Sequence, residues 1–94
     1  MIVADVSARI TAFIRERFLD GDPQGELRPD TPLVEWGVLT SMNTAILLIF
    51  IREELGTQVP ARYVNARNFQ NVDTISALVD ELSRGQQPTP AGTE

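Results

Sequence analysis

The residues best placed to carry out chemistry in this 94-residue chain are 37–42, Gly-Val-Leu-Thr-Ser-Met, where a glycine turn delivers a serine to an apolar helix. The free backbone N–H groups and the positive dipole end of a helix start stabilise negative charge. Ser41 is therefore placed to carry a phosphodiester on its hydroxyl oxygen. On the spacing alone, the commoner role of Thr40 and Ser41 at such a position is to cap the helix.

Catalysis by this serine is disfavoured by the composition. The chain has no histidine and no cysteine. Histidine is the commonest general base, and both residue types are the usual zinc ligands. Ser41 thus lacks a base that would make it a nucleophile, and no paired-carboxylate motif is present. An independent enzyme is the least favoured class.

Residues 20–25, Asp-Gly-Asp-Pro-Gln-Gly, imitate the first half of a calcium-binding EF-hand loop, with acids at positions 1 and 3 and glycine at position 6. The bidentate glutamate needed at position 12 is replaced by Thr31, and Pro23 stiffens the middle of the loop. We expect a turn between helices here and no metal site.

The charge balance excludes further classes of function. Eight arginines, no lysine and thirteen acids give a net charge of −5, which disfavours nucleic-acid binding by phosphate neutralisation. The start of the chain lacks the basic region of a signal peptide. The longest apolar run, residues 45–51, is too short to span a bilayer. We expect a soluble, cytoplasmic domain without membrane contact.

Apolar residues recur at the spacing of one helix face in three stretches, which predicts three main helices. Thr40 and Asn71 are favourable residues before a helix, and Gly56 is a favourable residue after one. No stretch alternates apolar and polar residues as a half-buried strand does. The sequence therefore predicts an all-α fold, a small bundle of three main helices plus one short helix, at residues 3–18, 40–55, 59–64 (the short one) and 72–83.

The connection between the first two helices is long, because the glycines and prolines of residues 20–37 interrupt any helix. We expect side chains that reach the core to pin this loop: Leu27, Leu33, Val34 and Trp36. Residues 1–84 are predicted to form one domain. Residues 85–94 contain two prolines and no large apolar side chain, which predicts a flexible C-terminal tail.

The predicted core collects the apolar faces of all three helices and one loop residue: Ile10, Phe13, Ile14, Leu33, Leu47, Ile51, Leu55, Val72, Ile75 and Val79. Residues 45–51 are apolar around the whole helix, and a bundle of three main helices cannot surround such a segment. With Leu47 and Ile51 facing inward and Leu48 and Phe50 at the borders, an apolar patch is left beside Ser41: Met42, Ala45, Ile46 and Ile49. Alternatively, the long loop or a homodimer contact covers Ile46 and Ile49.

Residues 33–42 resemble the phosphopantetheine attachment site of acyl and peptidyl carrier proteins, in which a glycine precedes Asp-Ser-Leu or Asp-Ser-Met. Residues 53–60 resemble the acidic, glycine-containing helix end of that family, with its following proline. Residues 68–75 resemble the Asn-Phe stretch that leads into its last helix. Three motifs in register, over about residues 2–82, identify the chain as similar to this family.

The resemblance implies a carrier domain, residues 1–84, with 4′-phosphopantetheine attached at Ser41 and cargo held as a thioester on the terminal thiol of that arm. The implied partners are a phosphopantetheinyl transferase, which uses magnesium and coenzyme A, a loading enzyme (adenylating or acyltransferase), and downstream synthase or tailoring enzymes. One position departs from the family: Thr40 stands where an aspartate is usual. This departure puts the rate of priming in doubt and leaves an unmodified relative open.

The implied function is that of a free-standing acyl or aminoacyl carrier, itself not an enzyme and monomeric. Carriers of fatty-acid synthesis usually keep Asp-Ser-Leu and a strongly acidic second helix, so we expect polyketide or nonribosomal peptide biosynthesis, the setting of many antibiotics. The alternatives are a D-alanyl carrier and an unmodified helical adaptor. The residues expected to dock partners are Thr40, Met42, Ala45, Ile46, Ile49 and Trp36, although for Trp36 pinning the loop is the commoner role.

Overall fold

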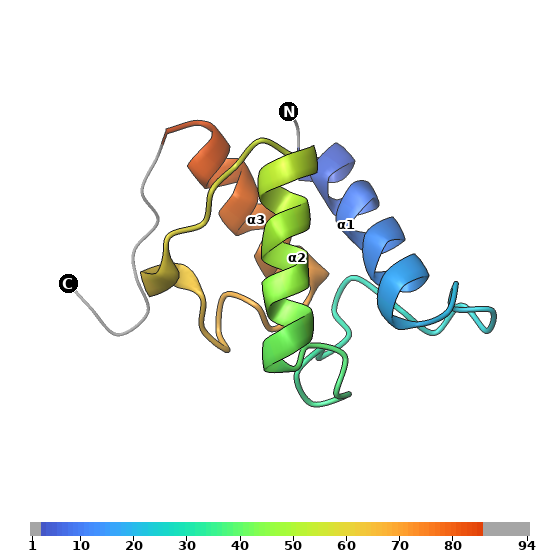
Figure 1. Cartoon of the computed structure of the whole chain (residues 1–94). Helices are drawn as coiled ribbons and strands as arrows, with labels where there is room; N and C mark the ends of the chain where they lie inside the picture. The colour runs from blue at the N-terminus through green and yellow to red at the C-terminus, as the bar shows by residue number, and fades with distance from the viewer. Residues whose placement is uncertain (1–2, 86–94) are drawn as a thin grey trace.

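Three α-helices and one short 3₁₀ helix make up the part of the chain that the computed structural model describes, residues 3–85 (Figure 1). They are α1 (Val3–Phe18), α2 (Ser41–Glu54), η1 (Ala61–Tyr63) and α3 (Val72–Ser83), with no strand in this range. The all-α prediction is confirmed, and the helices lie where the apolar spacing placed them. The tail predicted for residues 85–94 falls, from residue 86 on, outside the described residues.

Side-chain caps define where the helices begin. The Oγ1 of Thr40 accepts the N–H of Asn43 at 3.1 Å, which satisfies a free donor at the start of α2. Asn71 and Thr74 form a reciprocal capping box at the start of α3. After α2, Gly56 has a φ of +68°, a left-handed conformation that favours glycine. The predicted N-caps Thr40 and Asn71 are confirmed; the C-cap of α2 is Leu55, one residue before the predicted Gly56, which adopts the left-handed conformation directly after it.

The core is built from the apolar faces of α1, α2 and α3 together with residues of the loops. Nine of the ten predicted core side chains are buried; the exception is Phe13, which is only partly buried. Phe13 lies at the edge of the core, where its ring stacks on Phe50 of α2 with 4.1 Å between the centroids. The structure adds seven buried apolar residues: Val6, Leu27, Val38, Leu39, Tyr63, Phe69 and Leu78.

The helix α2 lies against the other two and is not enclosed by them. α1 and α3 approach each other most closely among the helices, and α2 lies in front of α3 with α1 at its side (Figure 1). Only Leu47 and Ile51 of α2 are fully buried. One face of this apolar helix therefore remains directed outward.

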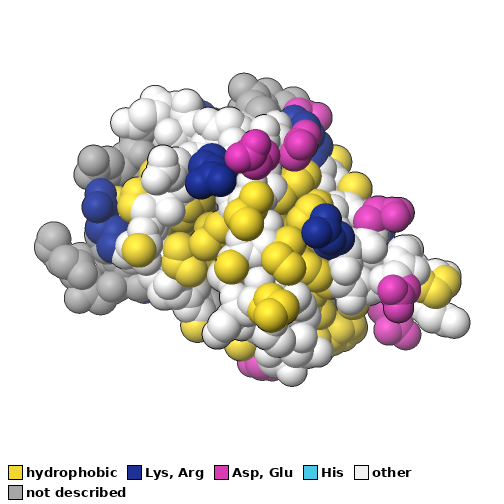
Figure 2. Space-filling view, viewed as in Figure 1, with side chains coloured by type: hydrophobic (Ala, Val, Ile, Leu, Met, Phe, Trp, Pro, Cys, Tyr) yellow, Lys and Arg dark blue, Asp and Glu magenta, His cyan; other side chains and the backbone are white. Residues whose placement is uncertain are grey.

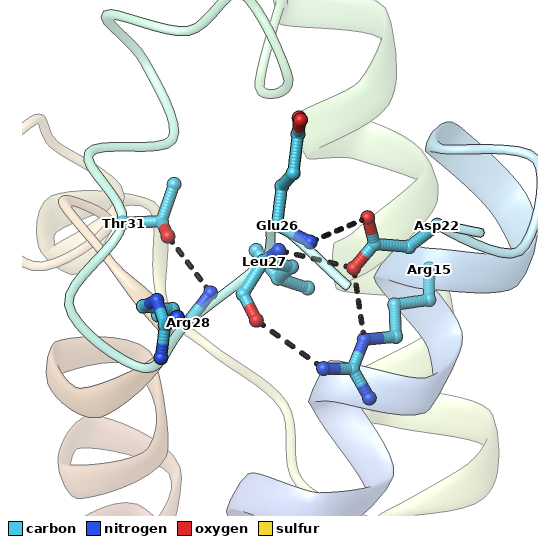
Figure 3. A network of polar contacts seen from close by, with 6 residues as sticks. All are labelled: Arg15, Asp22, Glu26, Leu27, Arg28 and Thr31. Carbon is cyan, nitrogen blue, oxygen red and sulfur yellow. Dashed lines mark hydrogen bonds and ion pairs between the residues drawn. The ribbon is translucent and has the colours of Figure 1, made fainter. Parts of the chain in front are cut away.

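The first turn of the long loop is tied to α1 through the carboxylate of Asp22 (Figure 3). This carboxylate accepts the backbone N–H groups of Glu26 and Leu27, each at 3.0 Å, and the Nε of Arg15 at 3.2 Å. The Nη2 of Arg15 also donates to the carbonyl of Leu27 at 3.2 Å. Asp22, one of the two acids of the calcium-like sequence, thus has both oxygens engaged in closing a turn between α1 and the loop.

Two of the four residues predicted to pin the long loop do so. Leu27 and Leu33 are buried, at 3% and 0% exposure. The same prediction for Val34 and Trp36 is wrong, because their side chains are 48% and 52% exposed. A turn closed by the Trp36 N–H and the Pro32 carbonyl, at 3.0 Å, follows the buried Leu33 and holds this stretch at the surface.

Truncation of Ile51 to alanine should destabilise the domain by about 2–5 kcal/mol, because this side chain is fully buried and its loss leaves a cavity. The melting temperature, followed by circular dichroism, should fall by about 10 °C or more. The matched control is Ile49→Ala on the exposed face of the same helix, which should melt close to the parent. Equal melting temperatures for the two variants would contradict this assignment of the faces of α2.

The stability of the domain should depend on the ionisation of Asp22. The Leu27 N–H, with smaller contributions from the Glu26 N–H and Arg15, holds the pKa of this carboxyl below its ordinary value. Its contribution is therefore present above the unfolded pKa and is lost as the pH falls through the folded pKa.

We expect Asp22→Asn to be less stable than the parent at pH 7 and the difference to shrink below about pH 4 in thermal melts. Asparagine tolerates the positive φ of 51° at this position. Asp20→Asn, at a site with the same φ of 51°, is the control and should show a smaller loss at pH 7. A constant difference at all pH values would contradict the role given to the carboxylate.

Candidate functional site

Ser41 is the first residue of α2, and its side chain is exposed. Thr40, the N-cap, is exposed as well, and its hydroxyl is engaged with the N–H of Asn43. The first turn of α2 contains no acidic residue. The site thus presents a serine hydroxyl at the positive end of a helix, with no carboxylate of that turn to oppose an attached anion.

The turn that delivers Ser41 is anchored in the core. Val38 and Leu39 are buried, at 5% and 6% exposure, and their N–H groups donate to the carbonyl of Leu33 at 2.9 and 3.2 Å. The N–H of Leu33 in turn donates to the carbonyl of Gln70, at 2.8 Å, in the segment before α3. Sequence reasoning identified the glycine turn and missed this anchor, although two successive apolar residues before Thr-Ser were the available signal.

The outward side of α2 carries the apolar residues that the sequence predicted, and we call them the α2 apolar face: Met42, Ala45, Ile46 and Ile49. Met42 is 72% exposed and Ile49 is 52% exposed, while Ile46 is partly buried. Figure 2 shows hydrophobic side chains gathered over α2, with acidic side chains toward its C-terminal end at the top of the view. The apolar face begins in the first turn of α2, directly beside Ser41.

A groove between α1 and α2 extends this face. Its volume is about 360 Å³, and it is lined by Phe13, Arg17, Ile46, Ile49, Phe50, Glu53 and Glu54. The guanidinium of Arg17 lies 5.7 Å from the centroid of the Phe13 ring. The sequence analysis placed no residue of α1 at the site; the i, i+4 spacing of Phe13 and Arg17 was the only hint.

The acidic residues of α2, Glu53 and Glu54, lie at its C-terminal end, opposite the end that carries Ser41. Glu53 is paired with the neighbouring Arg52 at 3.3 Å, and both side chains are well exposed, so the pair contributes little to stability. Among residues 3–85, no group of three or more histidine, cysteine, aspartate or glutamate side chains is arranged to hold a metal ion. The arrangement can present a hydroxyl for modification, together with an apolar surface for a partner.

None of the helices between residues 3 and 85 has both the length and the apolar content that a transmembrane span requires.

Comparison with known proteins gave two matches of note, while no family model matches the chain. Over 77 residues, the chain is 30% identical to the probable acyl carrier protein PigG of Serratia sp. (strain ATCC 39006). The aligned region covers 82% of this chain and 87% of that protein. The structure of this chain matches a chain in a crystal structure described as that of an FAD-dependent dehydrogenase, with a TM-score of 0.69 and 34% identity, over 74% of this chain and 97% of the other. The resemblance carried by residues 33–42, 53–60 and 68–75 is thereby confirmed, and the chain belongs to the acyl carrier protein family.

Proposed function

We propose that Ser41 carries a 4′-phosphopantetheine arm and that the domain presents cargo, held as a thioester, to partner enzymes. The observation that supports this most directly is the placement of Ser41. It is exposed at the first residue of α2, next to the α2 apolar face, in a segment whose sequence resembles the attachment motif of the family. The arm supplies the reactive thiol; the protein supplies attachment, presentation and recognition.

The site fits the group that it would hold. A phosphodiester on the Ser41 Oγ would lie at the positive end of α2, where only the third N–H of the helix is used by a side-chain cap. In the attachment step, the Ser41 Oγ forms a bond to the pantetheine-side phosphorus of coenzyme A. The bond from that phosphorus to 3′-phosphoadenosine 5′-phosphate breaks, and this nucleotide leaves. The hydroxyl proton passes to a base of the transferase, since this chain contains no histidine.

Incubation with coenzyme A, magnesium and a broad-specificity phosphopantetheinyl transferase should add one phosphopantetheine to the intact mass of the protein. Ser41→Ala should abolish the addition. Ser83→Ala, at an exposed serine in the last turn of α3, is the matched control and should be modified like the parent. Thr40→Asp, which restores the usual carboxylate and keeps a good N-cap residue, should be modified at least as fast as the parent.

Failure of every transferase, including one from the host of this protein, to modify the parent chain would overturn the proposal. The unmodified helical adaptor would then be the better description, because it needs only the apolar surface. A D-alanyl carrier remains the alternative within the family, and it is distinguished by which activated acid the loading enzyme transfers to the primed protein.

We place the carrier in polyketide or nonribosomal peptide biosynthesis, because α2 has acids only at Glu53 and Glu54 and lacks the strongly acidic surface of fatty-acid carriers. Loading by an adenylating enzyme or an acyltransferase would then act in trans. We infer that one tailoring partner is an FAD-dependent dehydrogenase, a proposal supported by the description of the crystal structure that holds the structural relative. Such a partner would transfer a hydride from the carried cargo to its flavin and the accompanying proton to one of its own bases, and bleaching of the flavin absorbance in anaerobic mixing would report the transfer.

We further propose that partners dock on the α2 apolar face, with Thr40 and Trp36 at its Ser41 end and the α1–α2 groove at its other end. Apolar area contributes to affinity without strong dependence on ionic strength, whereas charge pairing is screened by salt. Binding of the monomeric carrier to its loading enzyme should therefore depend weakly on salt.

The affinity of the carrier for its loading enzyme should change little between low and high salt, and Ile49→Glu should weaken it strongly, because a charge would enter the apolar contact. Calorimetric titration measures both effects. The control is Ala77→Glu, which adds the same charge at an exposed position of α3. A collapse of binding with salt, together with normal binding by Ile49→Glu, would refute the docking proposal.

A further inference from the structure

The side chain of Asn43 closes a small hydrogen-bonded ring around the residues that lead into Ser41. Its backbone N–H donates to the Oγ1 of Thr40 at 3.1 Å, and its Nδ2 donates to the carbonyl of Val38 at 2.8 Å. The ring joins the first turn of α2 to the turn before it.

We propose that Asn43 is a positioning residue for the modification of Ser41: its amide holds the turn of residues 38–40 in the arrangement that a phosphopantetheinyl transferase recognises. The inference rests on the proposed function of Ser41. Asn43 acts through the backbone of its neighbours and need not touch coenzyme A.

The carbonyl of Val38 is the point at which this restraint acts. Val38 is 5% exposed, and its N–H is already bonded to the carbonyl of Leu33. Without the Asn43 amide, the Val38 carbonyl would lose its side-chain donor at the edge of the core, which is unfavourable. With it, the peptide unit between Val38 and Leu39 is held from both sides, because its N–H, that of Leu39, donates to the Leu33 carbonyl of the long loop and its carbonyl accepts from Asn43 of α2. The Thr40 cap orders the helix start, and the Asn43 amide ties that start to the Val38 carbonyl of the turn that Leu33 anchors.

The same device occurs a second time in the described part of the chain, which provides a matched control. The Oδ1 of Asn65 accepts the N–H of Asn68 at 2.8 Å, and the Nδ2 of Asn68 donates to the carbonyl of Tyr63 at 2.9 Å. The spacing is identical, since each asparagine reaches the carbonyl five residues before it. The Asn68 ring closes the turn after η1 and contains no part of the Ser41 turn.

A transferase binds only the fraction of molecules in which the Ser41 turn has the competent arrangement. A lower competent fraction weakens apparent affinity by the same factor, while the bound complex reacts as before. Loss of the Asn43 contact should therefore raise the KM of the transferase for the carrier and leave kcat nearly unchanged.

The test measures transferase kinetics on the full chain for the parent, Asn43→Ala, Asn43→Asp and Asn68→Ala. Ionised aspartate keeps the size of asparagine and suits the first turn of a helix, but it cannot donate to the Val38 carbonyl. Both Asn43 variants should show a KM raised about fivefold or more, with kcat within about twofold, as expected for one lost hydrogen bond. Asn68→Ala should lower the melting temperature about as much as Asn43→Ala and leave the KM unchanged.

Amide hydrogen exchange adds a readout that does not depend on the transferase. The Val38 and Leu39 amides should exchange faster in both Asn43 variants, while the amides of α1 keep their protection. If Asn43→Ala does not fold, Asn43→Asp is sufficient for the test. A parental KM in the Asn43 variants, or an equal rise of KM in Asn68→Ala, would overturn the inference. Failure of the parent chain to be modified would instead overturn the proposed function of Ser41.

Discussion

The backbone of Leu33 joins the three segments on which the site depends. Its side chain is fully buried, its N–H donates to Gln70 before α3, and its carbonyl accepts the N–H groups of Val38 and Leu39 before α2. A long loop can be tolerated in a small domain only where such contacts offset the loss of chain entropy. Because Leu33 holds the loop in the core, Ser41 can be fully exposed and still have a defined position.

The second constraint is the half-buried state of α2. Leu47 and Ile51 are buried in the core and Leu48 and Phe50 pack at its edge, while Met42, Ala45 and Ile49 remain exposed. Burying them would require another long helix, and residues 3–85 form three α-helices and one short 3₁₀ helix. The exposed apolar surface is therefore a consequence of size and composition, and the groove beside Phe13 and Arg17 arises because α1 covers only one edge of it.

The sequence predicted most of the fold, because helix periodicity and caps such as Thr40 and Asn71 are local properties. It failed for Val34 and Trp36, which were assigned to the core because apolar side chains in a loop usually pin it. Whether Leu33, Val34 or Trp36 is buried depends on the backbone turn of this segment, and apolar character alone does not predict that turn. The ring around Asn43 and the groove at Arg17 also escaped prediction, since each depends on contacts between segments. The role of Ser41 as attachment residue comes from the motif and stays a prediction; the structure shows that this serine is exposed at the start of α2.

The lack of charged residues at the start of α2 bears on how enzymes choose between several carriers in one cell. Each enzyme must bind its own carrier more tightly than the other carriers, and its specificity is the difference between those two affinities. An enzyme whose docking site is lined with arginine and lysine gains attraction from an acidic helix, but it meets Thr40, Met42, Ala45 and Ile49 on this one. Such an enzyme must desolvate its cations against apolar side chains without a carboxylate in return. Under the docking proposal, the surface that admits an apolar partner would also exclude enzymes that bind carriers with an acidic second helix.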